Sequence, residues 1–210
     1  MAEKIRGRGK LFVISGPSGA GKGTICSALM KDADPEELCL SVSVTTRAPR
    51  TGEQDGVHYY FITEDEFEDL RMNDGLLEFA EVYGRHYGTP KQKVIDKLNE
   101  GVDVILEIEM QGALKVRKSY PDGVFIFILP PSMAELRKRI TGRGTETQEA
   151  IDYRLSQALS EIAYIDKYDY AVVNGSLDEA VERVRAIIKA EHSKVTEDIY
   201  KLIEQYKEDE

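Results

Sequence analysis

The chain has 210 residues, of which 41% are hydrophobic, 31% charged and 8% aromatic, with no tryptophan. This composition is typical of a folded domain, and no apolar run approaches the roughly 20 residues of a membrane span, so membrane-spanning, fibrous and wholly disordered proteins are excluded. With 28 basic against 38 acidic residues, the net charge of −10 argues against a surface that coats nucleic acid.

The N-terminal segment is basic and leads directly into an apolar strand. No hydrophobic signal-peptide region and no small-residue cleavage site precede that strand, so we expect a cytoplasmic protein. The two cysteines, Cys26 and Cys39, have no metal-ligand spacing and form no disulfide framework. We therefore expect two reduced thiols near the core.

A glycine-rich segment follows the strand expected at 11–15 and precedes a helical stretch at 25–31. The segment reads Gly16-Pro17-Ser18-Gly19-Ala20-Gly21-Lys22-Gly23-Thr24. This is the context of a Walker A motif, in which backbone N–H groups point at phosphates and the lysine reaches the β- and γ-phosphates. Gly23 stands where Ser or Thr usually follows the lysine, so we expect Thr24 to hold magnesium mainly through water.

From about Leu38 to Tyr87 the pattern changes to short alternating segments, at 39–44 and around 57–62. We expect an antiparallel insertion between α/β elements rather than a separate domain. Its first loop places Arg47 and Arg50 three residues apart, beside hydroxyl residues. Because a guanidinium matches phosphate oxygens in bidentate fashion, the pair could clamp a second phosphate; two solvated surface arginines are the alternative.

Three further apolar runs, at 104–108, 124–129 and 170–173, predict buried strands that alternate with helical stretches. This alternation implies a parallel sheet that is covered on both faces. Glu107 and Glu109 lie two residues apart at one strand end, which puts both carboxylates on one face. Pro90 is expected at a first helical position, and Ser or Thr followed three residues later by Glu or Gln marks helix starts at Thr63/Glu66, Thr89/Gln92, Ser132/Glu135 and Ser176/Glu179.

A glycine-interrupted helical region beginning near 133 contains the arginines 137, 139, 143 and 154. Such a region suits a lid that closes over phosphates; ion pairs along a helix face with Glu135, Glu146 and Glu149 are the alternative. After about 190 the chain is polar and acidic but keeps one apolar helical stripe, at Val195, Ile199, Leu202 and Tyr206. The stripe predicts a helix docked on the body, with a partner-binding helix as the alternative.

Taken together, these segments resemble guanylate kinases, which move a phosphoryl group from ATP to GMP. The resemblance runs from about Lys10 to Ala190 and is carried by GPSGAGKGT, SVSVTTRAPRTGEQDGVHYYF, LLEFAEVYGRHYGTP, ILEIEMQGA, ILPPS, RITGRGTET and VVN. It implies an α/β P-loop kinase fold, with a central parallel sheet flanked by helices, a β-rich insertion that binds the nucleoside monophosphate, and a helical lid. The single unit over 1–210 would have its core at about 10–37, 99–132 and 155–190, the insertion at 38–98, the lid at 133–154 and a C-terminal helical extension at 191–210.

The resemblance also implies which residues form the site. ATP would contact the loop from Gly16 to Thr24, together with Arg139 and Asn174, the latter beside the adenine. The residues implied around GMP are Ser43, Arg47, Arg50, Tyr59, Glu78, Tyr87, Thr89, Glu107 and Glu109. Catalytic charge would come from Mg²⁺ and from Lys22, Arg47, Arg143 and Arg154.

The chemistry of guanine agrees with the role implied for Glu78. Guanine presents two adjacent donors, N1–H and the 2-amino group, and a carboxylate can accept from both, whereas adenine would leave the buried carboxylate unpaired. Family members often carry Asp where Glu107 and Glu109 stand, which leaves the exact contacts of these two open. The GMP phosphate attacks directly, so His58, His86 and His192 are expected to be incidental.

Three alternatives are weighed against this interpretation. Another nucleoside monophosphate kinase would have a helical acceptor region, and a GTPase would carry an Asn-Lys-x-Asp guanine motif. A noncatalytic guanylate-kinase-like module that binds proteins would have an eroded phosphate loop. We expect the small molecules ATP and GMP as partners, not nucleic acid or membrane, and a monomer or small homo-oligomer.

Overall fold

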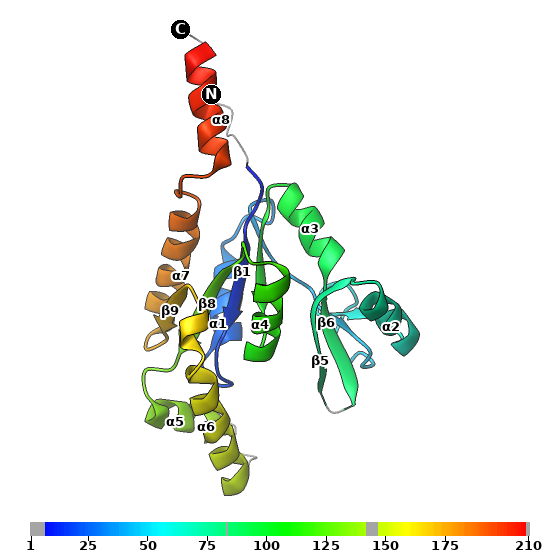
Figure 1. Ribbon diagram of the computed structural model, residues 1–210. Coiled ribbons are helices and arrows are strands. Elements are labelled where there is room, and N and C mark those ends of the chain that lie inside the picture. The colour runs from blue at the N-terminus through cyan, green and yellow to red at the C-terminus, as the bar shows by residue number, and fades with distance from the viewer. Residues whose placement is uncertain (1–6, 83, 142–146, 209–210) are drawn as a thin grey trace.

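The computed structural model describes residues 7–82, 84–141 and 147–208 (Figure 1). Within these residues, five strands form a parallel sheet in the order β2-β7-β1-β8-β9. In that order the strands are Leu38–Leu40, Asp103–Glu107, Leu11–Ser15, Val124–Leu129 and Tyr170–Val173. The prediction of an α/β fold with a central parallel sheet is confirmed.

Helices cover both faces of this sheet because its central strands are apolar on both sides. Phe12 and Ile14 of β1 face the buried residues of α1 (Lys22–Lys31) and α7 (Leu177–Glu191). Leu11 and Val13 face α3 (Lys91–Asn99) and α4 (Met110–Ser119). Burial of β1 on both faces fixes the strand firmly, and the glycine-rich segment follows at its carboxyl end.

A second, smaller sheet has the order β4-β3-β6-β5 and carries the helix α2 (Glu64–Met72). Its strands in that order are Tyr60–Phe61, Val44–Thr45, Arg85–Pro90 and Leu76–Val82. The β3–β6 and β5–β6 pairs are antiparallel, but β3 and β4 are parallel. Figure 1 shows this sheet on one side of the central sheet, and the helices α5 (Met133–Thr141) and α6 (Gln148–Ile162) on the other.

The expectation of a wholly antiparallel segment from Leu38 onward is wrong. β2 pairs in parallel with β7 at the edge of the central sheet, and only from β3 onward does the chain enter the smaller sheet. The alternation at 39–44 lies mostly beyond this short edge strand and runs on to the start of β3, which explains the error. The helix α3 also packs Val94 and Leu98 into the main core.

Two of the four predicted helix caps form. Thr63 makes a complete capping box with Glu66, and Ser132 accepts a hydrogen bond from the Glu135 N–H. Pro90 is the N-cap of α3 rather than its first helical residue, and the Thr89 hydroxyl bonds elsewhere. Ser176 begins α7 without a side-chain cap.

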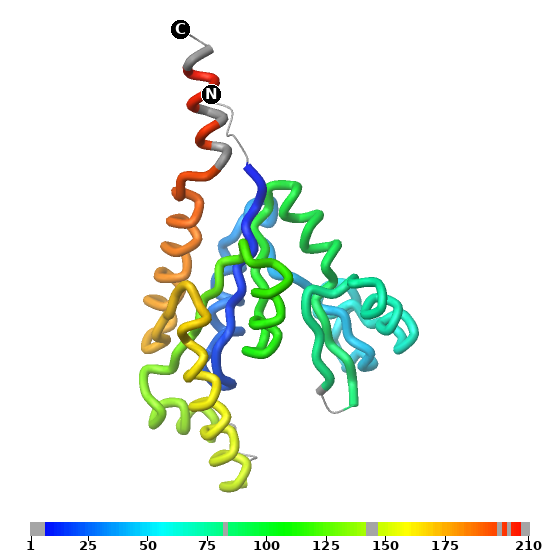
Figure 2. Tube along the Cα trace, in the orientation of Figure 1, coloured from blue at the N-terminus to red at the C-terminus, as the bar shows by residue number. Residues whose placement is uncertain are grey.

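The final helix, α8 (Glu197–Glu208), continues beyond α7 and away from the sheets (Figure 2). The prediction that it docks on the body is wrong: Ile199 is 40% exposed, Ile203 41% and Tyr206 59%. The link after α7 directs the helix past the end of the central sheet. Among the described residues, no helix has the length and apolarity needed to span a bilayer.

Candidate active site

The loop after β1 has a backbone that requires glycine. Gly16 and Gly21 have φ values of +142° and +97°, which residues with a side chain rarely adopt. A Cβ atom on Gly16 would lie 2.3 Å from the Ile128 carbonyl oxygen, and one on Gly21 would lie 2.3 Å from Nδ2 of Asn174. The loop therefore packs against β8 and the residue after β9 as closely as a backbone can.

Lys22 begins α1 and reaches back over this loop. Its Nζ donates to the carbonyl oxygens of Gly16 at 2.6 Å and Pro17 at 3.2 Å. Burial lowers the pKa of Lys22, and the negative charges of Glu107 and Glu161 partly oppose that shift. The ammonium group is thus held at the helix N-terminus, where backbone N–H groups also favour an anion.

A cavity of about 750 Å³ opens at this loop, between the carboxyl ends of the central strands and the helices α5 and α6. It brings together most of the predicted ATP residues and both strand-end glutamates. Its lining also includes residues that the sequence did not single out: Glu161 of α6, with Gly175 and Leu177. The full lining is Gly16, Ser18, Gly19, Gly21, Lys22, Gly23, Thr24, Glu107, Glu109, Arg139, Glu161, Asn174, Gly175 and Leu177.

The side chains of Asn174, Arg139 and Arg154 connect other elements to the loop. Buried Asn174 donates from Nδ2 to the Ala20 carbonyl oxygen at 2.8 Å. Arg139 of α5 donates to the Asn174 carbonyl oxygen at 3.0 Å, and Arg154 of α6 donates to the Ser18 hydroxyl at 2.8 Å. The two helices expected to form a lid therefore already contact the phosphate loop.

Ion pairs along helix faces account for part of the arginine-rich region. Arg137 pairs with Asp152, and Lys138 with Glu135. Arg139 also approaches Glu135, at 3.3 Å, in addition to its contact with Asn174. Arg143, expected to be catalytic, lies outside the described residues.

Glu107 and Glu109 both line the cavity, as their spacing predicts. A Cβ atom at Gly23 would lie 3.2 Å from Oε1 of Glu107, so the glycine leaves room for that carboxylate. Glu109 is in addition the N-cap of α4, where its carboxylate accepts from the N–H groups of Gln111 at 2.7 Å and Gly112 at 2.6 Å. Desolvation raises the pKa of Glu107, and the Lys22 charge opposes this.

Glu161 was missed because no motif surrounds it. It lies near the end of α6 and reaches the cavity only because that helix returns to the central sheet. Desolvation raises the pKa of Glu161, while Lys22 lowers it. The helical period could have placed it on the same face as Arg154, seven residues earlier.

The smaller sheet buries a carboxylate. Glu78 of β5 is 8% exposed and accepts a 2.6 Å hydrogen bond from the Thr89 hydroxyl of β6. Burial raises the pKa of Glu78, and this hydrogen bond opposes the shift. A Cβ atom on Gly112 of α4 would lie 3.0 Å from Oε2 of Glu78, so this carboxylate lies close to the central sheet.

A second group of predicted residues surrounds the Arg47 guanidinium. Arg47 lies over the Tyr59 ring at 5.6 Å, and that ring meets the Tyr87 ring edge-on at 5.9 Å. Its guanidinium pairs with Glu53, a residue that the sequence did not single out. Ser43, the residue before β3, is partly buried, whereas Arg50 is exposed.

His86, expected to be incidental, has contacts away from the phosphate loop. His86 stacks on Phe67 at 4.9 Å and meets Glu64 at 2.8 Å, which are contacts within the smaller sheet and α2. Both cysteines are free, and burial raises the pKa of Cys26 to about 12.

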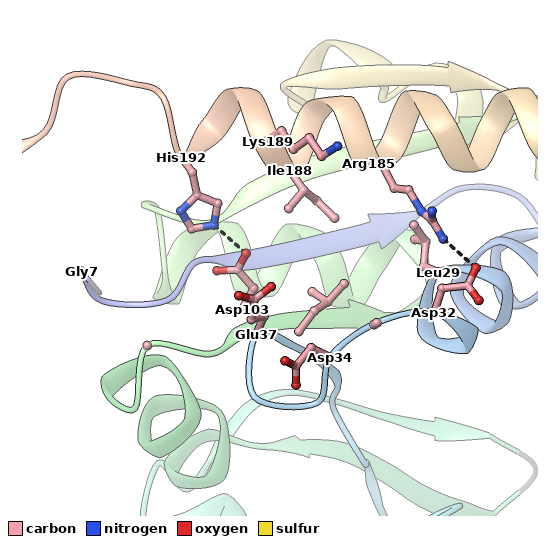
Figure 3. Close-up of a pocket in the computed structure, with 13 residues that line it drawn as sticks. Gly7, Leu29, Asp32, Asp34, Glu37, Asp103, Arg185, Ile188, Lys189 and His192 are labelled. Carbon is pink, nitrogen blue, oxygen red and sulfur yellow. Dashed lines mark hydrogen bonds and ion pairs between the residues drawn. The ribbon is translucent and has the colours of Figure 1, made fainter. Parts of the chain in front are cut away.

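A second cavity, of about 650 Å³, lies at the amino ends of the central strands (Figure 3). His192 meets Asp103 across it at 2.6 Å, and Arg185 meets Asp32 at 3.4 Å. None of the residues that line this cavity, all of them in the described part of the chain, is a predicted site residue. In a parallel α/β sheet, ligands bind at the carboxyl ends of the strands, which favours the cavity at the phosphate loop.

Comparison with known proteins agrees with this geometry. The family model described as guanylate kinase matches residues 8–191. The chain belongs to the guanylate kinase family. It is 56% identical over 188 residues to a guanylate kinase of Clostridium acetobutylicum, covering 90% of this chain and 88% of that protein. It is 55% identical over 203 residues to one of Clostridium perfringens, covering 97% and 93%.

A solved structure extends the family likeness to the fold. The crystal structure of guanylate kinase from Anaplasma phagocytophilum is similar to this chain with a TM-score of 0.69 at 38% identity. The match covers 90% of this chain and 88% of that one. A guanylate kinase thus shares both the central sheet and the general arrangement around it.

Proposed function

We propose that this protein transfers the γ-phosphoryl group of ATP to GMP, giving ADP and GDP in a reversible reaction. The buried carboxylate of Glu78 is the observation that carries the proposal. A buried carboxylate is costly unless donors satisfy it, and the Thr89 hydroxyl supplies one. The N1–H and 2-amino groups of guanine would supply two more, which adenine lacks.

The cavity at the phosphate loop would hold ATP. Its β- and γ-phosphates would lie against the loop N–H groups and Lys22, with Arg139 and Arg154 adding positive charge from the helices. Asn174 would border the adenine. Arg143 is included with these catalytic charges on the family resemblance alone.

The acceptor would lie on the smaller sheet. Arg47 and Arg50, with the hydroxyl groups of Tyr59 and Tyr87, would hold the GMP phosphate. Ser43 and Thr89 would face the base beside Glu78, and Glu107 and Glu109 would lie between the two nucleotides. This arrangement supports direct attack of a GMP phosphate oxygen on the γ-phosphorus, with no protein nucleophile.

We expect magnesium to bind together with ATP rather than to a set of protein ligands alone. Among the described residues, no three His, Cys, Asp or Glu side chains converge well enough to hold a metal ion. The Thr24 hydroxyl and the carboxylate of Glu107 line the cavity and would contact the ion directly or through water. When bound with ATP, Mg²⁺ neutralises charge on the transferring phosphates.

Closure would bring the two halves together and exclude water. The smaller sheet and the helices α5 and α6 stand on opposite sides of the phosphate loop (Figure 1). We infer that the smaller sheet approaches the loop when the two nucleotides bind, and that the helices, which already contact the loop, close further over it, because water attack on ATP would waste the phosphoryl group. Small-angle scattering tests this: GMP with a nonhydrolysable ATP analogue should reduce the radius of gyration, and an unchanged value would contradict closure.

The noncatalytic alternative is not favoured. The phosphate loop keeps its glycines and Lys22, and the related proteins of both Clostridium species are named guanylate kinase. A module that only bound proteins would not need this loop.

The reaction is tested by ADP release with ATP and magnesium, with GMP, AMP, CMP and UMP offered separately to the wild type and to Glu78→Gln. We expect turnover with GMP alone and a higher KM for GMP in the variant. Nucleotide binding without turnover of any acceptor would overturn the proposal and support the protein-binding module.

A further inference from the structure

The carboxylate of Glu53 accepts three hydrogen bonds within the loop that follows β3. Its Oε1 accepts from Nη2 of Arg47 at 2.9 Å, and its Oε2 accepts from Nη1 of the same guanidinium at 3.0 Å. Oε2 also accepts from the backbone N–H of Arg50 at 2.7 Å. The Arg47 and Glu53 side chains are only 15% and 19% exposed, so this pair is better shielded than most surface ion pairs.

The pairing uses one edge of the guanidinium and leaves another. Of the five N–H hydrogens of an arginine, Arg47 directs two from Nη1 to Ala48 and Glu53, and one from Nη2 to Glu53. The other two hydrogens, on Nε and Nη2, form a second edge of the same plane. The Tyr87 hydroxyl also bonds to this guanidinium, so an oxyanion that displaces it can take the second edge in bidentate fashion while Glu53 keeps the first.

The surroundings hold the guanidinium in this orientation. Its carbon lies 5.6 Å from the Tyr59 ring centroid and 5.8 Å from that of Phe61, within the range of cation–π contacts. The hydrogen bond with Glu53, and a further one with Tyr87, raise the pKa of Arg47. The Arg47 side chain is therefore fixed by a carboxylate at one edge and by aromatic rings beside it.

Glu53 is also held in the loop by hydrogen bonds to the backbone of Arg50. Its N–H donates to the Arg50 carbonyl oxygen at 3.0 Å, which closes a turn through Gly52 at a φ of +88°. Because Oε2 also accepts the Arg50 N–H, the carboxylate fixes the turn that carries the second arginine. One side chain thus sets the positions of both arginines expected to hold the acceptor.

We propose that Glu53 is a positioning residue for the acceptor: it orients Arg47 and the Arg50 turn so that they receive the phosphate of the nucleoside monophosphate. The inference rests on the proposed function, since it assumes that these arginines bind the acceptor phosphate. It predicts that Glu53 acts on the phosphate of GMP and not on its base or on ATP.

The test compares wild type, Glu53→Gln, Glu53→Ala and Glu68→Gln by steady-state kinetics and by calorimetric titration with GMP. Glu68 forms a local ion pair with Arg71 on α2, outside the proposed site, and serves as the control. Guanosine, which has the base but no phosphate, is measured as a competitive inhibitor. Thermal melting of each variant reports whether it is folded.

We expect Glu53→Ala to raise the KM and Kd for GMP roughly ten- to a hundred-fold, the scale on which a misplaced binding group lowers activity. Glu53→Gln, which keeps the size and one acceptor oxygen, should fall between this variant and the wild type. The KM for ATP and the inhibition constant of guanosine should change less than about twofold, as should every constant of Glu68→Gln.

Three outcomes would overturn the inference. Tighter GMP binding by Glu53→Ala would mean that the carboxylate competes with the phosphate for Arg47. Equal weakening of GMP, guanosine and ATP would mean a general structural loss. Unchanged GMP binding would mean no role. Failure of the proposed function looks different, because the wild type itself would then not turn over GMP.

Discussion

The hydroxyl of Thr89 donates a 2.6 Å hydrogen bond to the carboxylate of Glu78, and both residues are buried. The sequence pattern predicts a different partner, because Thr89 stands three residues before Gln92 in what reads as a helix cap. In the structure Pro90 is the N-cap of α3, without a side-chain hydrogen bond, and the Thr89 hydroxyl orients the Glu78 carboxylate instead. Thr89 thus has a role that is separable from helix formation.

Replacing Thr89 with valine keeps the shape of the side chain and removes this donor. A hydrogen bond to a charged group contributes about 1.5–3 kcal/mol, so we expect the KM for GMP to rise roughly ten- to a hundred-fold while the KM for ATP stays unchanged. Thr63→Val is the control, since that hydroxyl caps α2 and should affect stability alone. Equal changes in both KM values would contradict the assignment.

Acidification should weaken GMP binding earlier than it would for an exposed glutamate. In the proposed function the ionised form of Glu78 accepts the two guanine donors. Burial raises the pKa of Glu78, so its charge is lost at a higher pH than usual. Thr89 and, more weakly, Lys115 oppose the shift, whereas Glu109 adds to it. As pH falls, the KM for GMP of the wild type should therefore begin to rise at a higher pH than an exposed glutamate would give.

Glu78→Gln separates this titration from that of the GMP phosphate, which also gains a proton near pH 6. The phosphate titrates in the same way with both proteins. The KM of Glu78→Gln for GMP divided by that of the wild type therefore reports the titration of the Glu78 carboxylate alone. That ratio should be largest at high pH and approach one as pH falls through the raised pKa. A ratio that does not change with pH would exclude Glu78 as the titrating group.

Ionisation of Glu78 should lower the stability of the folded protein, although it should strengthen GMP binding. Because its folded-state pKa is raised, Glu78 favours the folded state most below the unfolded pKa, and this contribution is lost as pH rises through the folded pKa. Glu78→Gln should therefore unfold at a higher denaturant concentration than the wild type at pH 8, and the difference should shrink toward pH 4. Urea unfolding at several pH values measures it.

The contact of Gly21 with Asn174 should make that glycine irreplaceable. Gly21→Ala combines a φ of +97° with a Cβ atom 2.3 Å from Nδ2 of Asn174, whereas Gly84→Ala has a φ of +69° and open space. Gly84→Ala should cost only the backbone strain, about 1–2 kcal/mol. Gly21→Ala should lose more stability and also ATP affinity, as measured by melting and calorimetry; equal losses would show that strain alone matters.

The exposed stripe of α8 should contribute little to the stability of the body. Ile199→Ser and Ile203→Ser should change the free energy of unfolding by less than about 0.5 kcal/mol, as surface substitutions do. Val184→Ala, at a fully buried position of α7, is the contrasting control and should cost about 2 kcal/mol. Losses of similar size in all three would mean that α8 is docked in solution.

The central strands could be predicted because a parallel strand buried on both faces is apolar throughout. The runs at 11–15 and 124–129 coincide with β1 and β8 for this reason. β2 could not be assigned in the same way, since Cys39 and its neighbours are half-buried at a sheet edge. Alternation shows that a strand has two different faces, but not which sheet it joins.

Only part of the candidate site could likewise be predicted from the sequence. The phosphate loop is contiguous in sequence, so its strand, turn and helix predict one another and the cavity follows. Glu53 and Glu161 escaped notice because nothing in their local sequence distinguishes them from solvated acids. Their roles depend on which side chains the fold brings opposite them, namely Arg47 in one case and Lys22 in the other.

The start of β5 is fastened to the central core through α4. Lys115 donates to the Phe79 carbonyl oxygen at 2.6 Å, Leu77 packs in the main core, and Gly112 lies against Glu78. The carboxylate proposed to read the base therefore lies at the attached end of the smaller sheet, whereas Arg47 follows the short strand β3 within that sheet. If GMP binds and the sheet closes as proposed, guanine would be selected while the sheet is still open, and delivery of its phosphate would be a separate, later event.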